Sequence, residues 1–219
     1  MLKEFWEYRF GVLFGTLMVL LFSATIALQN RFEEEIFMGV FSLVLIASVN
    51  ALYRKTFYLT IFLGIGALSF FMNIVTYFSS SMDIEIEALA VNLIFLLCAI
   101  AIMFNHIFNG SKVDANLLLG AASLYLLMGV CFAYMYTIVD YFFPASFSGA
   151  LTSGTHGIHA LFAQFFYYSF VTLATVGYGD IMPVSQEARF LSLIEAILSQ
   201  LYMTILIARL VGMHLHHSK

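Results

Sequence analysis

Thr175-Val176-Gly177-Tyr178-Gly179-Asp180 is the stretch that decides how this chain folds. It separates two apolar runs and carries glycine at two alternating positions. Glycine adopts left-handed backbone conformations at little cost, so successive carbonyl groups of the stretch are able to point to one side. Irregular backbone between membrane helices is tolerated only where it is buried in protein or lines a water-filled path. The stretch therefore predicts a loop that lines a pore.

The composition indicates a membrane protein. Of the 219 residues, 62% are hydrophobic and only 10% are charged. A soluble domain of this length could not bury so much apolar surface, whereas lipid acts as its solvent. The net charge of −4 gives no indication of a nucleic-acid partner. Both cysteines, Cys98 and Cys131, lie inside apolar runs and are interpreted as packed thiols.

Apolar runs predict an all-α, multi-pass fold with six transmembrane helices. A shorter apolar run, about His159–Ala174, precedes the pore loop and is predicted to re-enter the membrane between helices five and six. The six predicted crossings cover about Phe10–Leu28, Ile36–Tyr53, Phe57–Tyr77, Ala88–His106, Asn116–Val139 and Ser185–His214.

Basic residues set the predicted orientation. Only Arg31 and Arg189 fall on one side of the predicted membrane. The positive-inside rule then places both termini in the cytoplasm and the pore loop at the outer face. The basic residues on the cytoplasmic side are Lys3, Arg9, Arg54, Lys55, Lys112, Arg209 and Lys219.

The TVGYGD stretch resembles the selectivity filter of tetrameric potassium channels, in which backbone carbonyls replace the water around the ion. The resemblance covers about Asn116–Gly212. It implies a homotetramer, because one chain supplies one filter and four copies are needed to surround an ion. It implies potassium as the permeant ligand and no cofactor. The implied filter residues are Thr175, Val176, Gly177, Tyr178 and Gly179, with potassium at the carbonyls of the first four and at the Thr175 hydroxyl.

The flanks of the loop extend this resemblance. Tyr167 and Tyr168 stand where many potassium channels have paired tryptophans, and from there they are expected to bond Tyr178 or Asp180. Thr172 belongs to the same predicted filter support. Minimal two-helix channels often place a Glu where this chain has Val171. The Glu–Asp bridge that supports their filter is therefore missing here.

The last predicted helix carries the candidate gating and cavity residues. Glu195 falls near mid-membrane, where a carboxyl group is costly. Two interpretations stay open: a neutral or hydrogen-bonded Glu braced against the pore helix, or a pH-sensitive gating element. Ser199 occupies the place of the glycine hinge found in many channels. Gln200, Met203 and Ile207 are predicted to line the cavity, by alignment and helical spacing.

Two domains are predicted: a four-helix transmembrane bundle over residues 1–107 and a pore domain over 108–219. The fourth predicted helix contains no Lys or Arg. A voltage sensor depends on such charges, each of which contributes about 2.3 kcal/mol per 100 mV. A conventional voltage sensor is therefore not expected. The polar residues of the bundle suit interhelical hydrogen bonds instead; they are Ser23, Ser42, Ser48, Asn50, Asn73 and Asn92. A role for the bundle in sensing lipids or small molecules stays open.

The sequence thus favours a potassium-selective channel of the cell membrane. Its expected partners are three further copies of itself and membrane lipids, with no nucleic acid. Two alternatives stay open: a weakly selective monovalent cation channel, and a membrane accessory subunit of a potassium uptake system. An enzyme is disfavoured because no paired carboxylates, metal-spaced ligands or nucleophile triad occur in the sequence.

Overall fold

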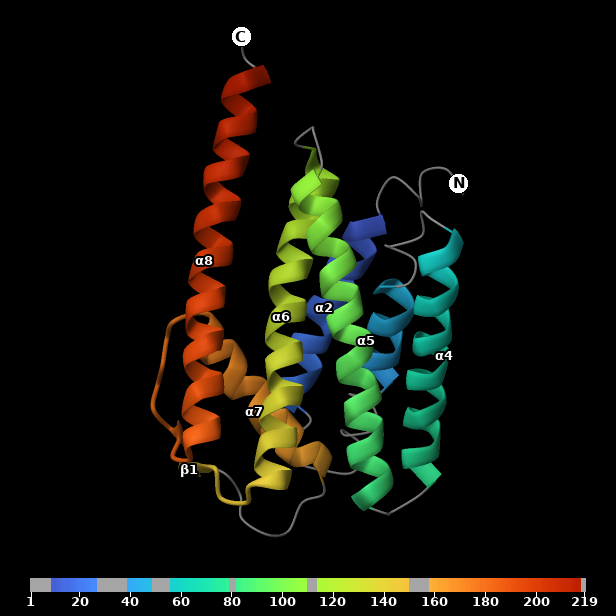
Figure 1. Cartoon of the computed structure of the whole chain (residues 1–219), viewed down its shortest axis with the longest axis vertical. Coiled ribbons are helices and arrows are strands. Elements are labelled where there is room, and N and C mark those ends of the chain that lie inside the picture. Colours follow the sequence, from blue (N-terminus) through green and yellow to red (C-terminus); the bar gives the residue numbers. More distant parts are fainter. Residues whose placement is uncertain are drawn as a thin grey trace.

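The structure, a computed structural model, describes residues 9–26, 39–48, 56–78, 82–109, 114–149 and 158–217. This part of the chain is mostly helical (Figure 1). A helical stretch, Gly39–Ser48, lies between the first two labelled helices. The labelled elements are α2 (Arg9–Ile26), α4 (Thr56–Phe78), α5 (Met82–Asn109), α6 (Ala115–Phe142), β1 (Phe147–Gly149), α7 (Ile158–Leu173), β2 (Ile181–Pro183) and α8 (Gln186–His217).

Three helices of the described part are long and apolar enough to cross a membrane. They are Ile84–Asn109, Ala115–Phe142 and Gln186–Met213. The prediction of an all-α membrane fold is confirmed to this extent. The segments predicted as the first three crossings contain shorter apolar helices, which are Phe10–Ser23, Gly39–Ser48 and Phe62–Thr76.

Helix boundaries follow local chemistry at two places. The helix α6 begins after Asp114, whose carboxylate accepts a 2.7 Å hydrogen bond from the Leu117 N–H and so caps the helix. The helix α5 begins at Met82, about two turns before the predicted start at Ala88. The extra turns include acidic residues, and the helix dipole favours negative charge near an N-terminus.

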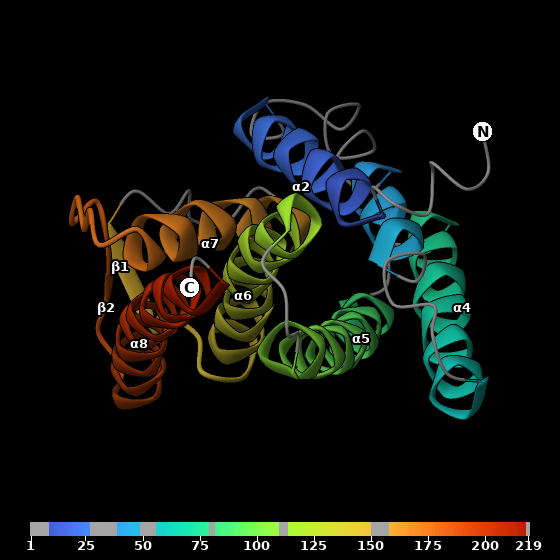
Figure 2. The same ribbon diagram turned by 90° about the horizontal axis from the view of Figure 1, so that it is seen from above.

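The helix α6 lies at the centre of the molecule, with α2, α5, α7 and α8 around it (Figure 2). Small residues allow this close packing: a Cβ added at Gly129 would lie 2.9 Å from the ring of Phe170 in α7. One at Gly120 would lie 3.2 Å from the ring of Phe10 in α2. Small residues let membrane helices approach closely, so α6 joins the N-terminal helices to the rest of the fold.

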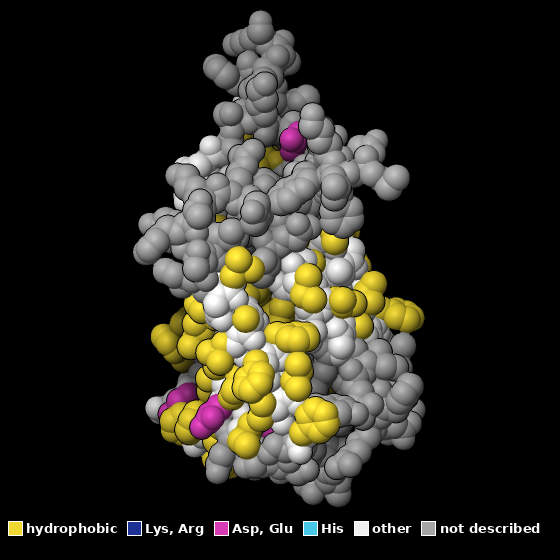
Figure 3. Space-filling view, turned by 90° about the vertical axis from the view of Figure 1, so that its right-hand side faces the viewer, with side chains coloured by type: hydrophobic (Ala, Val, Ile, Leu, Met, Phe, Trp, Pro, Cys, Tyr) yellow, Lys and Arg dark blue, Asp and Glu magenta, His cyan; other side chains and the backbone are white. Residues whose placement is uncertain are grey.

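Apolar side chains remain exposed on the outer helices. Figure 3 shows them over much of the described surface on the side of α4 and α5. A soluble monomer rarely exposes so continuous an apolar surface, whereas contact with lipid tails explains it. The exposed large apolar residues of these two helices are Leu63, Leu68, Phe70, Phe71, Ile74, Phe78, Ile94, Leu97 and Phe104.

A buried polar cluster connects α4, α5 and α6. Asn92 of α5 donates to the Asn73 side-chain oxygen at 3.0 Å and to the Tyr134 hydroxyl at 3.4 Å. Its own side-chain oxygen accepts a hydrogen bond from the Ser69 hydroxyl. Asn92 is 2% exposed and Ser69 is fully buried. The interhelical bonds predicted for Asn73 and Asn92 are thus present, whereas the hydroxyls of Ser23 and Ser48 donate to carbonyls one turn earlier in their own helices. Asn50 lies outside the described residues.

Replacing Asn92 with Leu should lower the thermal stability of the protein in detergent. The change strands the polar groups of Ser69 and Asn73 in an apolar interior, which costs roughly 1–3 kcal/mol per unsatisfied group. Ile94→Val, at an exposed apolar site on the same helix, is the matched control and should leave the melting temperature nearly unchanged. Equal melting temperatures for Asn92→Leu and the control would contradict the assignment of a stabilising role to this cluster.

Candidate functional site

The backbone of the pore loop alternates in handedness. The φ angle is positive at Thr175 (60°), Gly177 (59°) and Gly179 (78°), and at neither residue between them. Alternation between right-handed and left-handed residues turns successive peptide groups the same way. Left-handed φ is costly for a residue with a Cβ, and only Thr175 of these three carries one.

The N–H groups of the loop are bonded to the end of α7. The Val176 and Gly177 N–H groups both donate to the Val171 carbonyl, at 3.0 and 3.4 Å, and the Thr175 N–H donates to the Thr172 carbonyl at 2.9 Å. The accepting carbonyls lie in the last turn of α7, where carbonyls have no partner within the helix. In the described part of the chain, the carbonyls of residues 175–178 accept no hydrogen bond. They remain available to a ligand.

The C-terminal end of α7 is held from behind by α6. The Tyr125 hydroxyl of α6 donates a 2.8 Å hydrogen bond to the carbonyl of Leu173, the last residue of α7. The α7 sequence Ile158–Leu173 contains no Lys, Arg, Asp or Glu. The negative end of its dipole is therefore not neutralised by a cation of its own, and it favours a cation near the start of the loop.

The C-terminal end of the loop runs directly into a two-stranded ladder. The strand β2, which follows Asp180, pairs antiparallel with β1, with Gly149 opposite Ile181. The Val184 N–H extends the pairing by donating to the Ser146 carbonyl at 2.8 Å. Asp180 also accepts a 2.8 Å hydrogen bond from the Tyr167 hydroxyl. The loop is thus fixed at both ends, by α7 and by this ladder.

Aromatic rings fill the space behind the ladder. The Phe147 ring of β1 lies 4.6 Å from the Phe165 ring of α7 and 5.5 Å from the Tyr136 ring of α6, measured between centroids. Tyr168 contacts the same two rings, Phe147 and Tyr136. Such contacts contribute beyond their buried area, so β1, α6 and α7 form one rigid support for the loop.

A further set of polar contacts, centred on Glu195, joins α6, α7 and α8. Glu195 of α8 is fully buried. Its Oε2 accepts a 2.5 Å hydrogen bond from the Tyr136 hydroxyl of α6, and its Oε1 lies 2.5 Å from the Ser169 hydroxyl of α7. The geometry matches the interpretation of Glu195 as a hydrogen-bonded brace against the pore helix.

The comparisons with known proteins agree with this geometry. Residues 121–214 match a protein family described as "Ion channel". Over 89 residues, 41% of this chain, the sequence is 35% identical to the two-pore potassium channel 4 of Arabidopsis thaliana. This part of the chain is similar to pore-loop potassium channels. Both matches point to an ion channel rather than to an enzyme.

The matched segment corresponds to about a quarter of the plant channel's length, 26% of it. No solved structure matches the chain. The family match therefore lies in the C-terminal half of the chain and does not reach α2, α4 and α5.

The residues predicted to support the filter have different partners in the structure. Tyr167 reaches Asp180, whereas the Tyr168 hydroxyl shares a 2.8 Å hydrogen bond with Ser192 of α8. Thr172 contributes its backbone carbonyl to the loop. Tyr178 is 71% exposed in the single chain.

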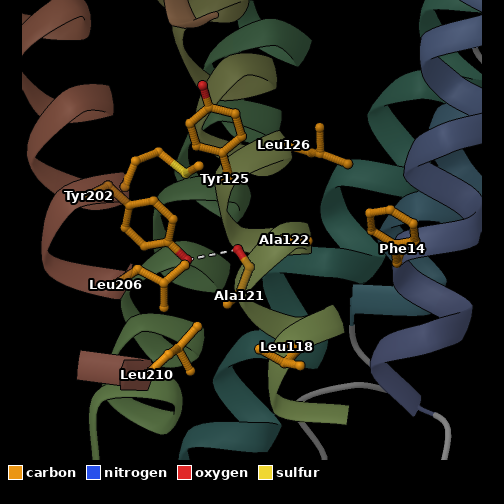
Figure 4. A pocket seen from close by; sticks show the side chains of 10 residues that line it. Phe14, Leu118, Ala121, Ala122, Tyr125, Leu126, Tyr202, Leu206 and Leu210 are labelled. Atoms are coloured by element: carbon orange, nitrogen blue, oxygen red, sulfur yellow. Dashed lines mark hydrogen bonds between the residues drawn. The ribbon is translucent and has the colours of Figure 1, made fainter. Parts of the chain in front are cut away.

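The predicted hinge and cavity residues lie along α8. Ser199 is buried and its hydroxyl donates within the helix to the Ala196 carbonyl at 3.0 Å. Gln200, Met203 and Ile207 are exposed in the single chain. Met203 also lines a different cavity, an apolar one of about 220 Å³ within the single chain, between α2, α6 and α8. Figure 4 shows the Tyr202 hydroxyl in this cavity, where it donates to the Ala121 carbonyl at 2.7 Å.

Sequence reasoning missed the tyrosines of α6 that hold the site. Tyr125 and Tyr136 are about three helical turns apart, so they lie on the same face of α6. A tyrosine pair at that spacing on an otherwise apolar helix is the signal that could have found them. No comparable signal marks Ser169 or Gly149, because their partners are distant in the sequence.

Substituting Tyr167 with Phe should weaken the outer anchor of the channel's pore loop. The variant loses the hydrogen bond to Asp180 but keeps the ring. Because both groups are exposed, we expect a loss of only about 1 kcal/mol. Potassium over sodium selectivity, read from reversal potentials, should fall several-fold at most. Tyr141→Phe, on α6 away from the loop, is the control. A Tyr167→Phe channel indistinguishable from the control would remove Tyr167 from the filter support.

Proposed function

We propose that this protein is a potassium-selective channel that conducts potassium passively through a central pore formed by four copies of the chain. The observation that carries the proposal is the backbone of Thr175–Gly179, which alternates in the sign of φ and has its N–H groups bonded behind. The carbonyls of Thr175, Val176, Gly177 and Tyr178 are then free to coordinate a dehydrated potassium ion.

The exposure of the loop supports assembly around an axis. Val176 is 51% exposed and Tyr178 is 71% exposed in the single chain. One loop surrounds an ion on one side only, so a closed ring of copies is required. The helix α8 also exposes an apolar face that neighbouring copies and lipid would cover. Its residues include Leu193, Ile197, Leu198, Leu201 and Ile205.

The proposed channel has six crossings, with residues 1–107 as a peripheral bundle and 108–219 as the pore domain. The start of α2 and the end of α8 lie at the same end of the molecule (Figure 1), which supports placing both on the same side of the membrane. Gating by a conventional charged sensor is not proposed, because α5 contains no Lys or Arg. Gln200, Met203 and Ile207 would line the cavity below the filter.

The test is a reversal potential in a planar bilayer. Purified protein is reconstituted with KCl on one side and NaCl on the other. We expect the reversal potential to lie close to the potassium equilibrium potential. A value near zero would indicate a weakly selective cation channel, and absence of current would favour an accessory subunit. Bilayers without protein are the control, and chemical cross-linking of the same preparation should trap species up to the tetramer.

A further inference from the structure

The environment of Glu195 is closed and specific. In the described part of the chain, its carboxyl group contacts two polar side chains, Tyr136 and Ser169, and forms no ion pair. The Ser169 hydroxyl has a second partner, the Gly129 carbonyl of α6, at 2.8 Å. Glu195, Ser169 and Gly129 belong to α8, α7 and α6, so this chain of oxygens joins all three helices of the pore.

The contacts fix the number of protons shared by these hydrogen-bonded oxygens. Between the Gly129 carbonyl, Ser169 Oγ and Glu195 Oε1 there are two short oxygen–oxygen contacts. A hydroxyl has one proton to donate and a carbonyl has none. If Ser169 donates to Gly129, the contact with Glu195 requires a proton on Glu195. If Ser169 donates to Glu195 instead, two acceptors face each other at 2.8 Å. Only a protonated Glu195 satisfies both contacts.

Among the residues that the structure describes, the titratable groups around Glu195 provide no positive charge that would hold a carboxylate. Those that interact with Glu195 are Tyr125, Cys131 and Tyr136 of α6 and Tyr168 of α7. All four are neutral acids at neutral pH. An isolated carboxylate in such an apolar interior would be costly, and a buried group of this kind takes its neutral form instead.

We propose that Glu195 is a positioning residue held in its protonated form, and that its proton ties α8 to the pore helix α7 and so to the filter. Ser169 lies within one turn of Val171 and Thr172, the residues whose carbonyls hold the N–H groups of the loop. Loss of the proton leaves Ser169 with a single proton for two acceptors, so one of its two bonds breaks. It also places a charge between α7 and α8. The consequence for conduction rests on the proposed channel function.

Two variants separate the proton from the shape of the side chain. Glu195→Gln keeps the size and supplies an N–H₂ donor toward Ser169 and a carbonyl acceptor toward Tyr136, which reproduces the protonated network without a titratable group. Ser169→Ala removes the acceptor of the Glu195 proton while leaving the carboxyl group in place. If Glu195→Gln fails to fold, Ser169→Ala still tests the proposal.

The test combines infrared spectroscopy with conductance on the same vesicle-reconstituted protein. At neutral pH, wild type minus Glu195→Gln should show the carbonyl stretch of a carboxylic acid, shifted in Ser169→Ala. Raising the pH should remove this band and reduce wild-type potassium conductance several-fold, while Glu195→Gln stays constant. A carboxylate band at neutral pH, an unshifted band in Ser169→Ala or equal pH profiles would overturn the proposal. A wild-type channel without potassium selectivity would overturn the proposed function instead, since the infrared result does not depend on conduction.

Discussion

Gly149→Ala is expected to abolish potassium conduction, although the substitution lies outside the filter. Gly149 has a φ of 114°, a value that side chains rarely tolerate. A Cβ at this position would lie 1.8 Å from the carbonyl oxygen of Asp180 and 2.8 Å from its carbonyl carbon. Both are backbone atoms, so no rotamer change relieves the overlap. Either β1 leaves β2, or Asp180 moves and takes the end of the filter with it.

The measurement for Gly149→Ala is single-channel recording beside circular dichroism of the same preparation. Helical content should remain near wild type, because the helices pack elsewhere, whereas potassium current should fall more than tenfold. Ser148→Ala, the adjacent residue of the same strand, is the matched control and should conduct normally. A Gly149→Ala channel with wild-type current would mean that the β1–β2 ladder does not hold the filter.

The conformation of the loop and the helices α6 and α8 could be predicted from the sequence because their causes are local. Glycine at 177 and 179 permits positive φ wherever the chain places it, and both residues show it. The helices α6 and α8 follow apolar runs, and Asp114 caps α6 in the ordinary way. Each of these features depends on residues within a few positions of one another, so a single sequence was sufficient.

The contacts that hold the loop could not be predicted, because they join distant residues. Tyr136 and Glu195 are 59 positions apart, and Ser169 and Glu195 are 26 apart. The expectation that Tyr167 and Tyr168 both support the filter shows the limit of local reasoning. Adjacent residues on a helix point about 100° apart. Only Tyr167 therefore reaches Asp180, while Tyr168 faces Ser192 of α8.

The N-terminal helices are predictable in type but not in arrangement. Apolar runs predict that they are helices, and α2, α4 and α5 are. Their relative positions are set by contacts such as Asn92 with Tyr134 and Phe10 with the surface of α6 at Gly120. An apolar run has no pattern that indicates which neighbour it meets, since lipid and protein are nearly equivalent solvents for it.

Gly177→Ala is expected to remove potassium selectivity through backbone conformation alone. Gly177 has a φ of 59°, and a Cβ added there meets no atom within 4 Å in the single chain. An L-residue in the left-handed region costs roughly 1–2 kcal/mol. In the proposed tetramer four copies would bear this cost around one ion, so the alternation of φ should fail and the carbonyls at 176 and 177 should turn away from the pore.

Gly212→Ala is the matched control for this prediction. A Cβ at Gly212 also meets nothing within 4 Å, but this residue is helical, with no positive φ. The two substitutions add the same atom to equally open space and differ in backbone conformation. Reversal potentials between KCl and NaCl should stay near the potassium value for Gly212→Ala and move toward zero for Gly177→Ala. If both variants remain selective, the handedness of residue 177 does not determine ion coordination, and selectivity must arise from other groups in the pore.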